Sequence, residues 1–263
     1  MISFVKYEGA GNDFILIDDR PPSFDFSQVR QLCDRKFGIG ADGVILLQND
    51  PVADFRMRIF NSDGSEAESC GNGLRCLARF VQELKRDNGA LRIAAHDRIV
   101  EAFYFDGREK IGIKMGEPRN LWLNLPLTMD GAIWTVHSVD TGVPHLVHFV
   151  ENLEGFDVQG VGSRLRRHPA FGPGGTNVNF VHLQPDGSLA VRTFERGVEG
   201  ETLACGTGAT AVGVIAAHIL GLSSPIRTRF KGGEIEISFS DRGLADLCMI
   251  GCTRKVFSGV FFL

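Results

Sequence analysis

The chain has 263 residues, enough for two domains of ordinary size, and its 43% hydrophobic and 23% charged residues are typical of a globular protein. Its net charge of −4 excludes a basic surface for nucleic acid, and no apolar stretch is long enough to cross a bilayer. Because the N-terminal sequence lacks the apolar core of a signal peptide, we expect a cytoplasmic protein with no membrane or nucleic-acid partner. Its six cysteines are then expected to be thiols.

Short apolar runs separated by Gly, Asp and Asn recur along the chain and predict strands. These runs are residues 14–17, 44–47, 55–60, 111–115, 146–150, 178–183, 189–194 and 235–239. Helical patterns are fewer and cover residues 27–37, 74–85 and 207–220. Many strands with few helices favour an α+β architecture over alternating βαβ units.

Three further segments carry expectations of their own. The helix at 207–220 is apolar almost all round, which predicts that protein surrounds it on every side. The apolar run 255–262 would expose too much surface if it were free, so we expect it to return as a strand to the first domain. The basic cluster at 164–168 is expected to be a solvated loop, because the chain as a whole is acidic.

One motif occurs twice in the chain. Its two copies are Glu66-Ala67-Glu68-Ser69-Cys70-Gly71-Asn72-Gly73 and Glu201-Thr202-Leu203-Ala204-Cys205-Gly206-Thr207-Gly208. In each copy a Gly-x-Gly follows the cysteine, and a helical apolar stretch follows the glycines. Gly40 and Gly175 also lie equally far upstream of their cysteines, which indicates one ancestral unit used twice.

An internal duplication predicts two pseudo-symmetric domains, each a sheet wrapped around a central helix. The boundary is expected near Gly116. The first domain would comprise residues 1–116, with 252–263 returning to it, and the second would comprise residues 117–251.

The two cysteines suit proton transfer. A cysteine just before a helix start lies near unpaired N–H groups and the positive end of the helix dipole, which lower the pKa of a thiol. The glycines that follow leave backbone amides open to an anion such as a carboxylate. A folded duplication would bring Cys70 and Cys205 face to face. One thiolate would then remove an α-proton, and the opposite thiol would protonate the other face of the carbon.

The chain resembles the diaminopimelate epimerase family in motifs that keep their order along essentially the whole sequence. They are the two cysteine motifs, Gly9-Ala10-Gly11-Asn12-Asp13-Phe14, Phe60-Asn61-Ser62-Asp63-Gly64-Ser65 and Glu195-Arg196-Gly197. The resemblance implies an isomerase that interconverts LL- and meso-2,6-diaminopimelate without pyridoxal phosphate or a metal. It also implies two similar domains, a role in making lysine and peptidoglycan precursors, and a homodimer.

The resemblance also implies roles for individual residues. Cys70 and Cys205 would be the base and the acid, with His145 near the first thiol and Glu195 near the second to tune their protonation. Arg196 would bind the distal carboxylate, because its planar fork matches that group. The remaining substrate contacts would fall on Asn12, Asn61, Gly71, Asn72, Asn177, Glu195, Gly206 and Thr207.

One position departs from the family pattern. Many members carry Asn where Val143 stands, and valine cannot donate that hydrogen bond to the distal end of the substrate. Thr141 or a bridging water are the alternatives for this contact, and Asn61, Asn177 and Arg196 keep diaminopimelate the favoured substrate. Glu66 and Glu201 are expected to cap or brace their turns rather than to transfer protons.

Two alternatives remain open at this stage. A racemase of another amino acid, such as histidine or proline, would share the thiol pair and differ in its distal pocket. A thiol redox or sensor protein would use Cys70 with Cys76 or Cys205, although the chain contains no Cys-x-x-Cys motif.

Overall fold

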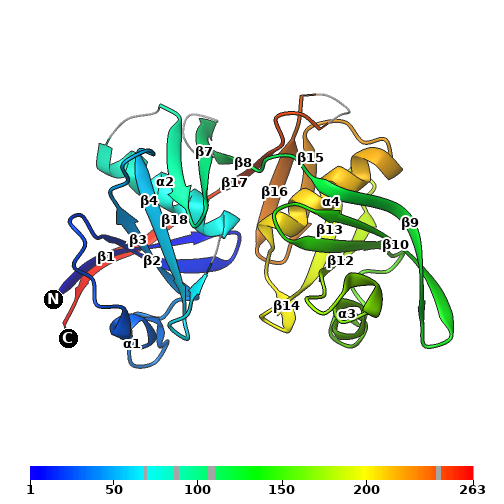
Figure 1. Cartoon of the computed structure of the whole chain (residues 1–263), viewed down its shortest axis with the longest axis horizontal. Helices are drawn as coiled ribbons and strands as arrows, with labels where there is room; N and C mark the ends of the chain where they lie inside the picture. The colour runs from blue at the N-terminus through cyan, green and yellow to red at the C-terminus, as the bar shows by residue number, and fades with distance from the viewer. Residues whose placement is uncertain (68–69, 86–88, 106–109, 241–243, 263) are drawn as a thin grey trace. The chain divides into compact units, whose positions relative to one another are not determined.

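The computed structural model describes residues 1–67, 70–85, 89–105, 110–240 and 244–262. The chain divides into two compact units (Figure 1). Unit 1 comprises residues 1–114 and 251–263, and unit 2 comprises residues 115–250.

Unit 1 is a mixed sheet with two α-helices, α1 (Val29–Cys33) and α2 (Gly71–Lys85), and a 3-10 turn, η1 (Phe26–Gln28). Its strands are β1 (Ile2–Gly9), β2 (Asn12–Asp18), β3 (Gly43–Gln48), β4 (Phe55–Asn61), β5 (Glu66–Ala67), β6 (Leu91–Ala95), β7 (Arg98–Phe105), β8 (Lys110–Lys114) and β18 (Arg254–Phe261). The pairs β1–β2, β3–β4, β4–β5, β6–β7 and β7–β8 are antiparallel, whereas β2–β3 and β4–β6 are parallel.

Unit 2 contains α3 (Val158–Arg166), α4 (Gly206–Ile219) and the 3-10 turn η3 (Pro169–Phe171). Its strands are β9 (Arg119–Met129), β10 (Ala132–Asp140), β11 (Pro144–Phe149), β12 (Asn177–Leu183), β13 (Leu189–Glu195), β14 (Gly200–Thr202), β15 (Ile226–Phe230), β16 (Gly233–Ser238) and β17 (Cys248–Cys252), which crosses the unit boundary. The series from β10 to β16 repeats the order of parallel and antiparallel pairs found from β1 to β7. The predicted α+β fold with two pseudo-symmetric domains is confirmed.

One helix lies at the centre of each unit. In unit 1, α2 contacts β1, β2, β4 and β8, and in unit 2, α4 contacts β10, β11, β15 and β16 (Figure 1). The side chains of α4 that are fully buried are Ala209, Thr210, Ala211, Val212, Val214, Ile215 and Ala216. The all-round burial expected from the apolar pattern is therefore observed over residues 208–216, whereas His218 in the last turn is exposed.

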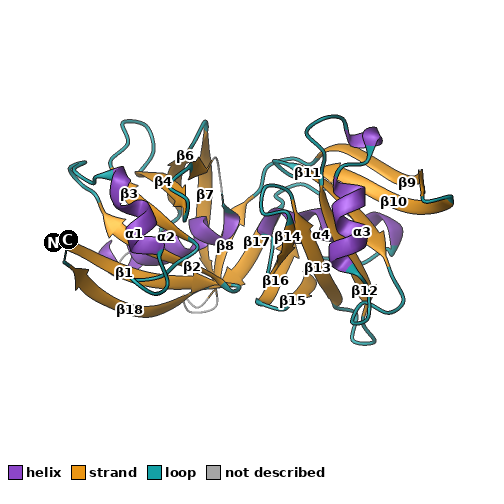
Figure 2. Cartoon of the chain, turned by 90° about the horizontal axis from the view of Figure 1, so that it is seen from below, coloured by secondary structure: helices purple, strands orange, loops and turns teal. Residues whose placement is uncertain are grey.

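The last strand of the chain joins the first. β18 pairs antiparallel with β1 over the register from Ile2 opposite Phe261 to Glu8 opposite Arg254. Figure 2 shows the two strands side by side, with both ends of the chain next to each other.

Two local predictions were wrong. The helix expected over 27–37 ends at Cys33, because the Asp34 side chain accepts hydrogen bonds from the backbone N–H groups of Lys36 and Phe37 at 2.7 and 2.8 Å. The basic cluster at 164–168 is not a free loop, since its first residues form the end of α3.

Glu199 holds this basic cluster in place. Arg166 and Arg167 bind its carboxylate at 2.7 and 2.6 Å.

The helix α3 was missed because it contains two glycines. Gly162 is required there, since a Cβ atom would lie 2.6 Å from the Cβ of Phe194.

Candidate functional site

Cys70 lies directly before α2, where the sequence motif places it. Its carbonyl accepts a hydrogen bond from the N–H of Leu74 at 2.8 Å, and its Sγ accepts from the N–H of Gly73 at 3.4 Å. The residue is half-buried. The first N–H groups of a helix have no intrahelical acceptor, so this turn presents donors beside a thiol.

Cys205 occupies the corresponding place in unit 2 and is the N-cap of α4. Its carbonyl accepts from the N–H of Ala209 at 2.8 Å, and its Sγ lies 3.5 Å from the hydroxyl of Thr207. A Cβ atom on Gly208 would lie 2.5 Å from the Oδ1 of Asn179 and 3.3 Å from this sulfur, which explains the glycine. At 7% exposure, Cys205 is more deeply buried than Cys70.

The glutamates of the two motifs brace the hairpins that precede the cysteines. Glu66 on β5 receives two bonds of 2.8 Å from Arg58 on β4. Glu201 on β14 receives bonds of 2.7 and 2.6 Å from Arg192 on β13. Both carboxylates are thus engaged in bidentate ion pairs, which is the bracing role expected from the sequence.

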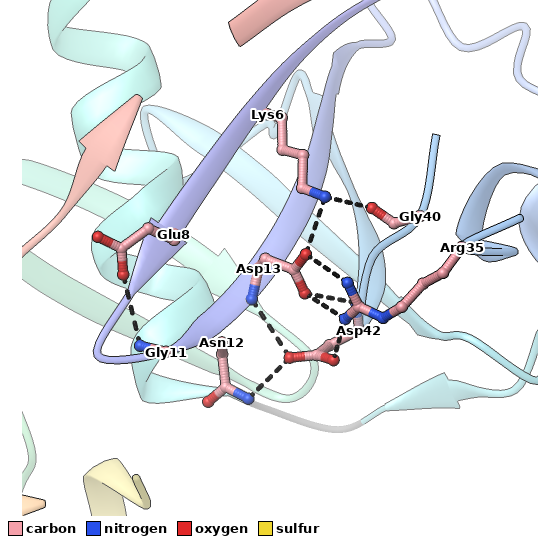
Figure 3. Close-up of polar contacts among 8 residues, drawn as sticks. All are labelled: Lys6, Glu8, Gly11, Asn12, Asp13, Arg35, Gly40 and Asp42. Atoms are coloured by element: carbon pink, nitrogen blue, oxygen red, sulfur yellow. Dashed lines mark hydrogen bonds and ion pairs between the residues drawn. The ribbon is translucent and has the colours of Figure 1, made fainter. Parts of the chain in front are cut away.

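Asn12 lies at the edge of a charged cluster at the start of β2 (Figure 3). Its Nδ2 donates to Asp42 at 3.1 Å, and Arg35 binds both Asp42 and Asp13. Burial alone would raise the pKa of Asp13, but hydrogen bonds from Arg35 and Lys6 lower this pKa to about 2. Asp13 is therefore a carboxylate at neutral pH, and the bond to Asp42 orients the amide group of Asn12.

Asn12 and Asn72, both predicted substrate contacts, lie against each other. Asn72 donates from Nδ2 to the Oδ1 of Asn12 at 2.6 Å, and its own Oδ1 accepts from the guanidinium of Arg75 at 2.9 Å. Arg75 is completely buried. No feature of the sequence distinguishes Arg75, because an arginine in an amphipathic helix usually faces solvent.

Two predicted contacts end corresponding strands. Asn61, the last residue of β4, is exposed and donates to the hydroxyl of Ser65 at 3.0 Å. Glu195, the last residue of β13, accepts from the hydroxyl of Thr202 at 2.5 Å. Burial raises the pKa of Glu195, and hydrogen bonds from Thr202 and Cys205 partly offset this increase. The structure therefore brings Glu195 to the second thiol.

Asn177 and Arg196 are also adjacent. Asn177 Nδ2 donates to the carbonyl of Pro144 at 3.1 Å, and its Oδ1 accepts from the backbone N–H of Arg196 at 2.9 Å. The guanidinium of Arg196 has a 3.5 Å contact with the carbonyl of Gly174. Val143, which precedes Pro144, is half-buried. The hydroxyl of Thr141 donates to the carbonyl of Thr207 at 2.9 Å. That bond already uses the hydroxyl of Thr141, the protein group considered as a substitute for the family asparagine.

His145 lies in the interior of unit 2. Its Nε2 is 2.9 Å from the hydroxyl of Thr207, and its Nδ1 is 3.2 Å from the Nδ2 of Asn179. Asn179 in turn accepts from the hydroxyl of Thr193 at 2.9 Å. Burial, with a smaller contribution from the charge of Arg196, lowers the pKa of His145 to about 3, so its ring is neutral at pH 7.

Asn179 and Thr193 were missed by the sequence analysis. Both lie in the apolar runs read as strands, and a polar residue inside such a run usually points to solvent. Their side chains are instead fully buried. The available signal was the pair of asparagines in Asn177-Val178-Asn179, which places two amide groups on one side of a buried strand.

The burial of neutral His145 predicts a pH dependence of stability. The unfolded chain takes up a proton at this side chain below about pH 6.5, whereas the folded chain does so only near pH 3. The free energy of unfolding should therefore decrease as the pH is lowered from about 6.5 to about 3. The expected slope is about 1.4 kcal/mol per pH unit. The variant His145→Gln should lack this component.

Urea titrations at several pH values would measure the slope. The chain has 2 tryptophans, at positions 122 and 134 in unit 2, so their fluorescence reports the unit that contains His145. Parallel stability curves for the original chain and the variant would contradict a neutral buried histidine.

Within the described residues, no helix is long and apolar enough to cross a membrane. In the same part of the chain, no group of three or more His, Cys, Asp and Glu side chains is arranged to hold a metal ion.

The chain is similar to known proteins over nearly its whole length. The family model for diaminopimelate epimerase matches residues 4–121 and 137–256. A diaminopimelate epimerase of Synechococcus sp. (strain JA-2-3B'a(2-13)) is 44% identical over 98% of this chain and 97% of the relative. One from Aquifex aeolicus (strain VF5) is 39% identical, over 98% of this chain and 97% of the relative.

Solved structures show the same fold at low identity. A phenazine biosynthesis protein of the PhzF family from Bacillus anthracis superposes with a TM-score of 0.75 at 15% identity, over 99% of both chains. A probable proline racemase from Agrobacterium radiobacter superposes with a TM-score of 0.72 at 17% identity, over 100% of this chain and 93% of the other. With a family model and relatives that span nearly its whole length, the chain belongs to the diaminopimelate epimerase family.

Proposed function

We propose that this isomerase interconverts LL- and meso-2,6-diaminopimelate with Cys70 and Cys205 as its two acid/base groups, and that it serves the synthesis of lysine and peptidoglycan precursors. The observation that carries the proposal is the repeated arrangement of a cysteine before a central helix in each unit. Epimerisation requires a proton to leave one face of a carbon and another to arrive on the opposite face. A duplicated fold with one thiol per copy supplies the two groups.

In the proposed reaction one cysteine is a thiolate and the other is a thiol. The α C–H bond breaks as the thiolate takes the proton, and the opposite S–H bond then breaks as a new C–H bond forms. Negative charge develops on the α-carboxylate meanwhile, and in this proposal the N–H groups of Gly71, Asn72, Gly206 and Thr207, which begin the two central helices, stabilise it. The two cysteines exchange roles when the reaction runs in the other direction.

At the second thiol, the proposed acid/base partner is Glu195. Burial raises the pKa of its carboxyl, and Cys205 is one of its hydrogen-bond donors. Such a carboxylate can accept the thiol proton and return it within the site, which maintains the thiolate needed for one direction. His145 contacts Thr207 and Asn179, next to the turn that carries Cys205, so its role at the first thiol stays a prediction from the family resemblance.

We place the distal carboxylate of the substrate on Arg196. The variant Arg196→Lys should raise KM for diaminopimelate about tenfold with a smaller change in kcat, because an ammonium group cannot form the bidentate pair. The matched control is Arg229→Lys, because Arg229 is a surface arginine that pairs with Asp186. This variant should leave both constants unchanged. Steady-state kinetics would decide, and an unchanged KM for Arg196→Lys would contradict this placement.

A racemase of another amino acid is the second candidate function. It is favoured by Val143, which lacks the amide that many members of the family direct toward the distal end of the substrate. Such an enzyme would keep both thiols and lose the preference for a second carboxylate.

Proton NMR in D2O tests the substrate and the reaction together. The reduced protein is mixed with LL-diaminopimelate, with no added cofactor, and both loss of the α-proton signal and formation of the meso isomer are followed. Exchange together with epimerisation is the expected result. Exchange with histidine or proline but not with diaminopimelate would favour the second candidate. No exchange with any of the three amino acids would favour the thiol-sensor alternative.

We also propose that the enzyme is a homodimer. The support is a set of apolar side chains on and beside β18 that are about half exposed or more. They are Val256, Phe257, Val260 and Phe262. Sedimentation equilibrium should give twice the mass of one chain, and Val260→Glu should shift the equilibrium toward the monomer. A monomer at micromolar concentration would contradict this proposal.

A further inference from the structure

The two units offer an internal comparison beneath their cysteine turns. Equivalent strand positions carry three buried apolar side chains in unit 1 and three fully buried polar side chains in unit 2. The apolar set is Phe14, Ile45 and Ile59, and the polar set is His145, Asn179 and Thr193. Burying polar groups costs free energy unless they are hydrogen-bonded, and an apolar solution exists in the same fold. The polar set therefore calls for an explanation beyond stability.

The glycines above these sets show the same contrast. A Cβ on Gly73 would meet the methyl group of Ile45 at 3.0 Å, whereas a Cβ on Gly208 would meet the Oδ1 of Asn179 at 2.5 Å. Asn179 thus lies directly against the turn that carries Cys205.

The orientation of the Asn179 amide follows from its partners. Its Nδ2 lies 2.9 Å from the carbonyl oxygen of Leu146, and a carbonyl oxygen can only accept a hydrogen bond. Its Oδ1 receives the hydroxyl of Thr193 at 2.9 Å. Exchanging the amide nitrogen and oxygen would set two oxygens against each other at Leu146, so the amide group has one orientation.

This orientation determines the tautomer of His145. The amide nitrogen of Asn179 donates to Nδ1 at 3.2 Å, so Nδ1 is the nitrogen without a proton. In a neutral ring the proton is then on Nε2, which lies 2.9 Å from the Thr207 hydroxyl oxygen. His145 is therefore a hydrogen-bond donor to Thr207.

Because Thr207 accepts from His145, its own hydroxyl proton is available to another acceptor. The Sγ of Cys205 lies 3.5 Å away, within the range for a hydrogen bond to sulfur. We propose that Asn179, held by Thr193, is a positioning residue that fixes His145 as a donor to Thr207, so that the Thr207 hydroxyl donates to the sulfur of Cys205. This inference rests on the proposed function only in assigning Cys205 a catalytic role.

The chain of donors makes the two cysteines chemically unequal. A hydroxyl that donates to Cys205 stabilises its thiolate more than its thiol. In unit 1, the counterpart of Thr207 is Asn72, whose side chain donates to Asn12 instead. Glu195 and Arg196 also face the polar set, the first as an acceptor for Cys205 and the second through its charge on His145.

NMR of the chain labelled with 15N-histidine tests the tautomer directly. The His145 signals are assigned by their loss in His145→Gln, and the long-range proton–nitrogen pattern shows which ring nitrogen carries the proton. We expect a neutral ring protonated on Nε2 at pH 7. A ring protonated on Nδ1, or on both nitrogens, would overturn the proposal. The measurement needs neither substrate nor activity, so it is independent of the epimerase assignment.

The effect on the sulfur is tested by alkylation. The rate of iodoacetamide labelling is followed against pH by mass spectrometry of the Cys205 peptide, with the Cys70 peptide as an internal reference. In Asn179→Leu the midpoint for Cys205 should rise by about one pH unit, which is about tenfold less thiolate below both midpoints, while the midpoint for Cys70 stays in place.

Thr193→Val and Thr228→Val complete the design. Thr193→Val, which preserves volume, should move the Cys205 midpoint in the same direction by a smaller amount. Thr228 is another fully buried threonine of unit 2, with its hydroxyl bonded to the carbonyl of Ile235, so Thr228→Val should move neither midpoint. Folded Asn179→Leu and Thr193→Val proteins with an unmoved Cys205 midpoint would overturn the proposal. If Asn179→Leu does not fold, Thr193→Val and the tautomer measurement still decide.

Discussion

Replacement of either Cys70 or Cys205 by alanine should reduce epimerisation at least about 10³-fold, because each variant lacks the proton donor or acceptor on one face of the α-carbon. The remaining thiol can still take a proton from its own face and return a deuteron to that face. Exchange with solvent should therefore survive without inversion, and for a different stereoisomer in each variant. Proton NMR in D2O with the separate LL and meso isomers measures both quantities.

Cys252→Ser is the matched control for the cysteine variants, because Cys252 is exposed and lies outside both motifs. Its rates of exchange and epimerisation should equal those of the original chain. The two-thiol mechanism would be contradicted if Cys70→Ala or Cys205→Ala epimerised within tenfold of the original rate. It would leave the family assignment untouched, since that rests on sequence similarity.

The second large effect concerns stability. Arg192→Met should lower the free energy of unfolding of unit 2 by about 3 kcal/mol, because Arg192 is mostly buried and serves several acceptors. Its guanidinium binds Glu201 through two bonds and also donates to the carbonyls of Leu153 and Phe156 at 2.9 and 3.0 Å. Substitution leaves these carbonyls without this donor and removes the link from the segment 153–156 to the β13–β14 hairpin that leads to Cys205.

The duplication supplies the control for this prediction. Arg58 forms the equivalent ion pair with Glu66, but these side chains are 29% and 47% exposed, against 17% and 21% for Arg192 and Glu201. Solvent screens the more exposed pair, so Arg58→Met should cost about 1 kcal/mol even though its guanidinium lies over the ring of Phe26. Urea unfolding and hydrogen exchange resolved by unit would test this ranking. Equal losses in the two variants would show that burial does not distinguish the two braces.

Part of the fold was predictable because several strands, β3 and most of β12 among them, are buried on both faces and appear as continuous apolar runs. β3, for example, is buried at every position. The duplication was readable because glycines and cysteines recur at fixed spacing. Other elements were missed, β9 and α3 among them. β9 alternates apolar and exposed positions, which is a strand pattern, but it forms no continuous apolar run and contains Pro126. α3 contains a glycine, Gly162, that packs closely on Phe194 of β13.

The candidate site was predictable where chemistry depends on local sequence. A cysteine followed by Gly-x-Gly and an apolar helix indicates a thiol at a helix start, and the structure has this arrangement in both units. Arg75 and Thr193 were not predictable, because their importance depends on partners distant in sequence. For Asn179 the spacing of Asn177 and Asn179 was a signal, but it did not identify the partners. Only the strand order brings Asn179 opposite Thr193 and beside His145.

The discontinuity of unit 1 has a consequence for the order of events at the ribosome. Its strand β18 follows the whole of unit 2 in the chain, yet pairs with β1 at the beginning. Unit 2 can therefore fold before unit 1 is complete. Until β18 is available, the edge of β1 that pairs with it remains unpaired. If the chain is stopped at residue 253 and continued as a flexible linker long enough to span the exit tunnel, unit 2 should be resistant to proteolysis while β1 remains open to capture by a chaperone.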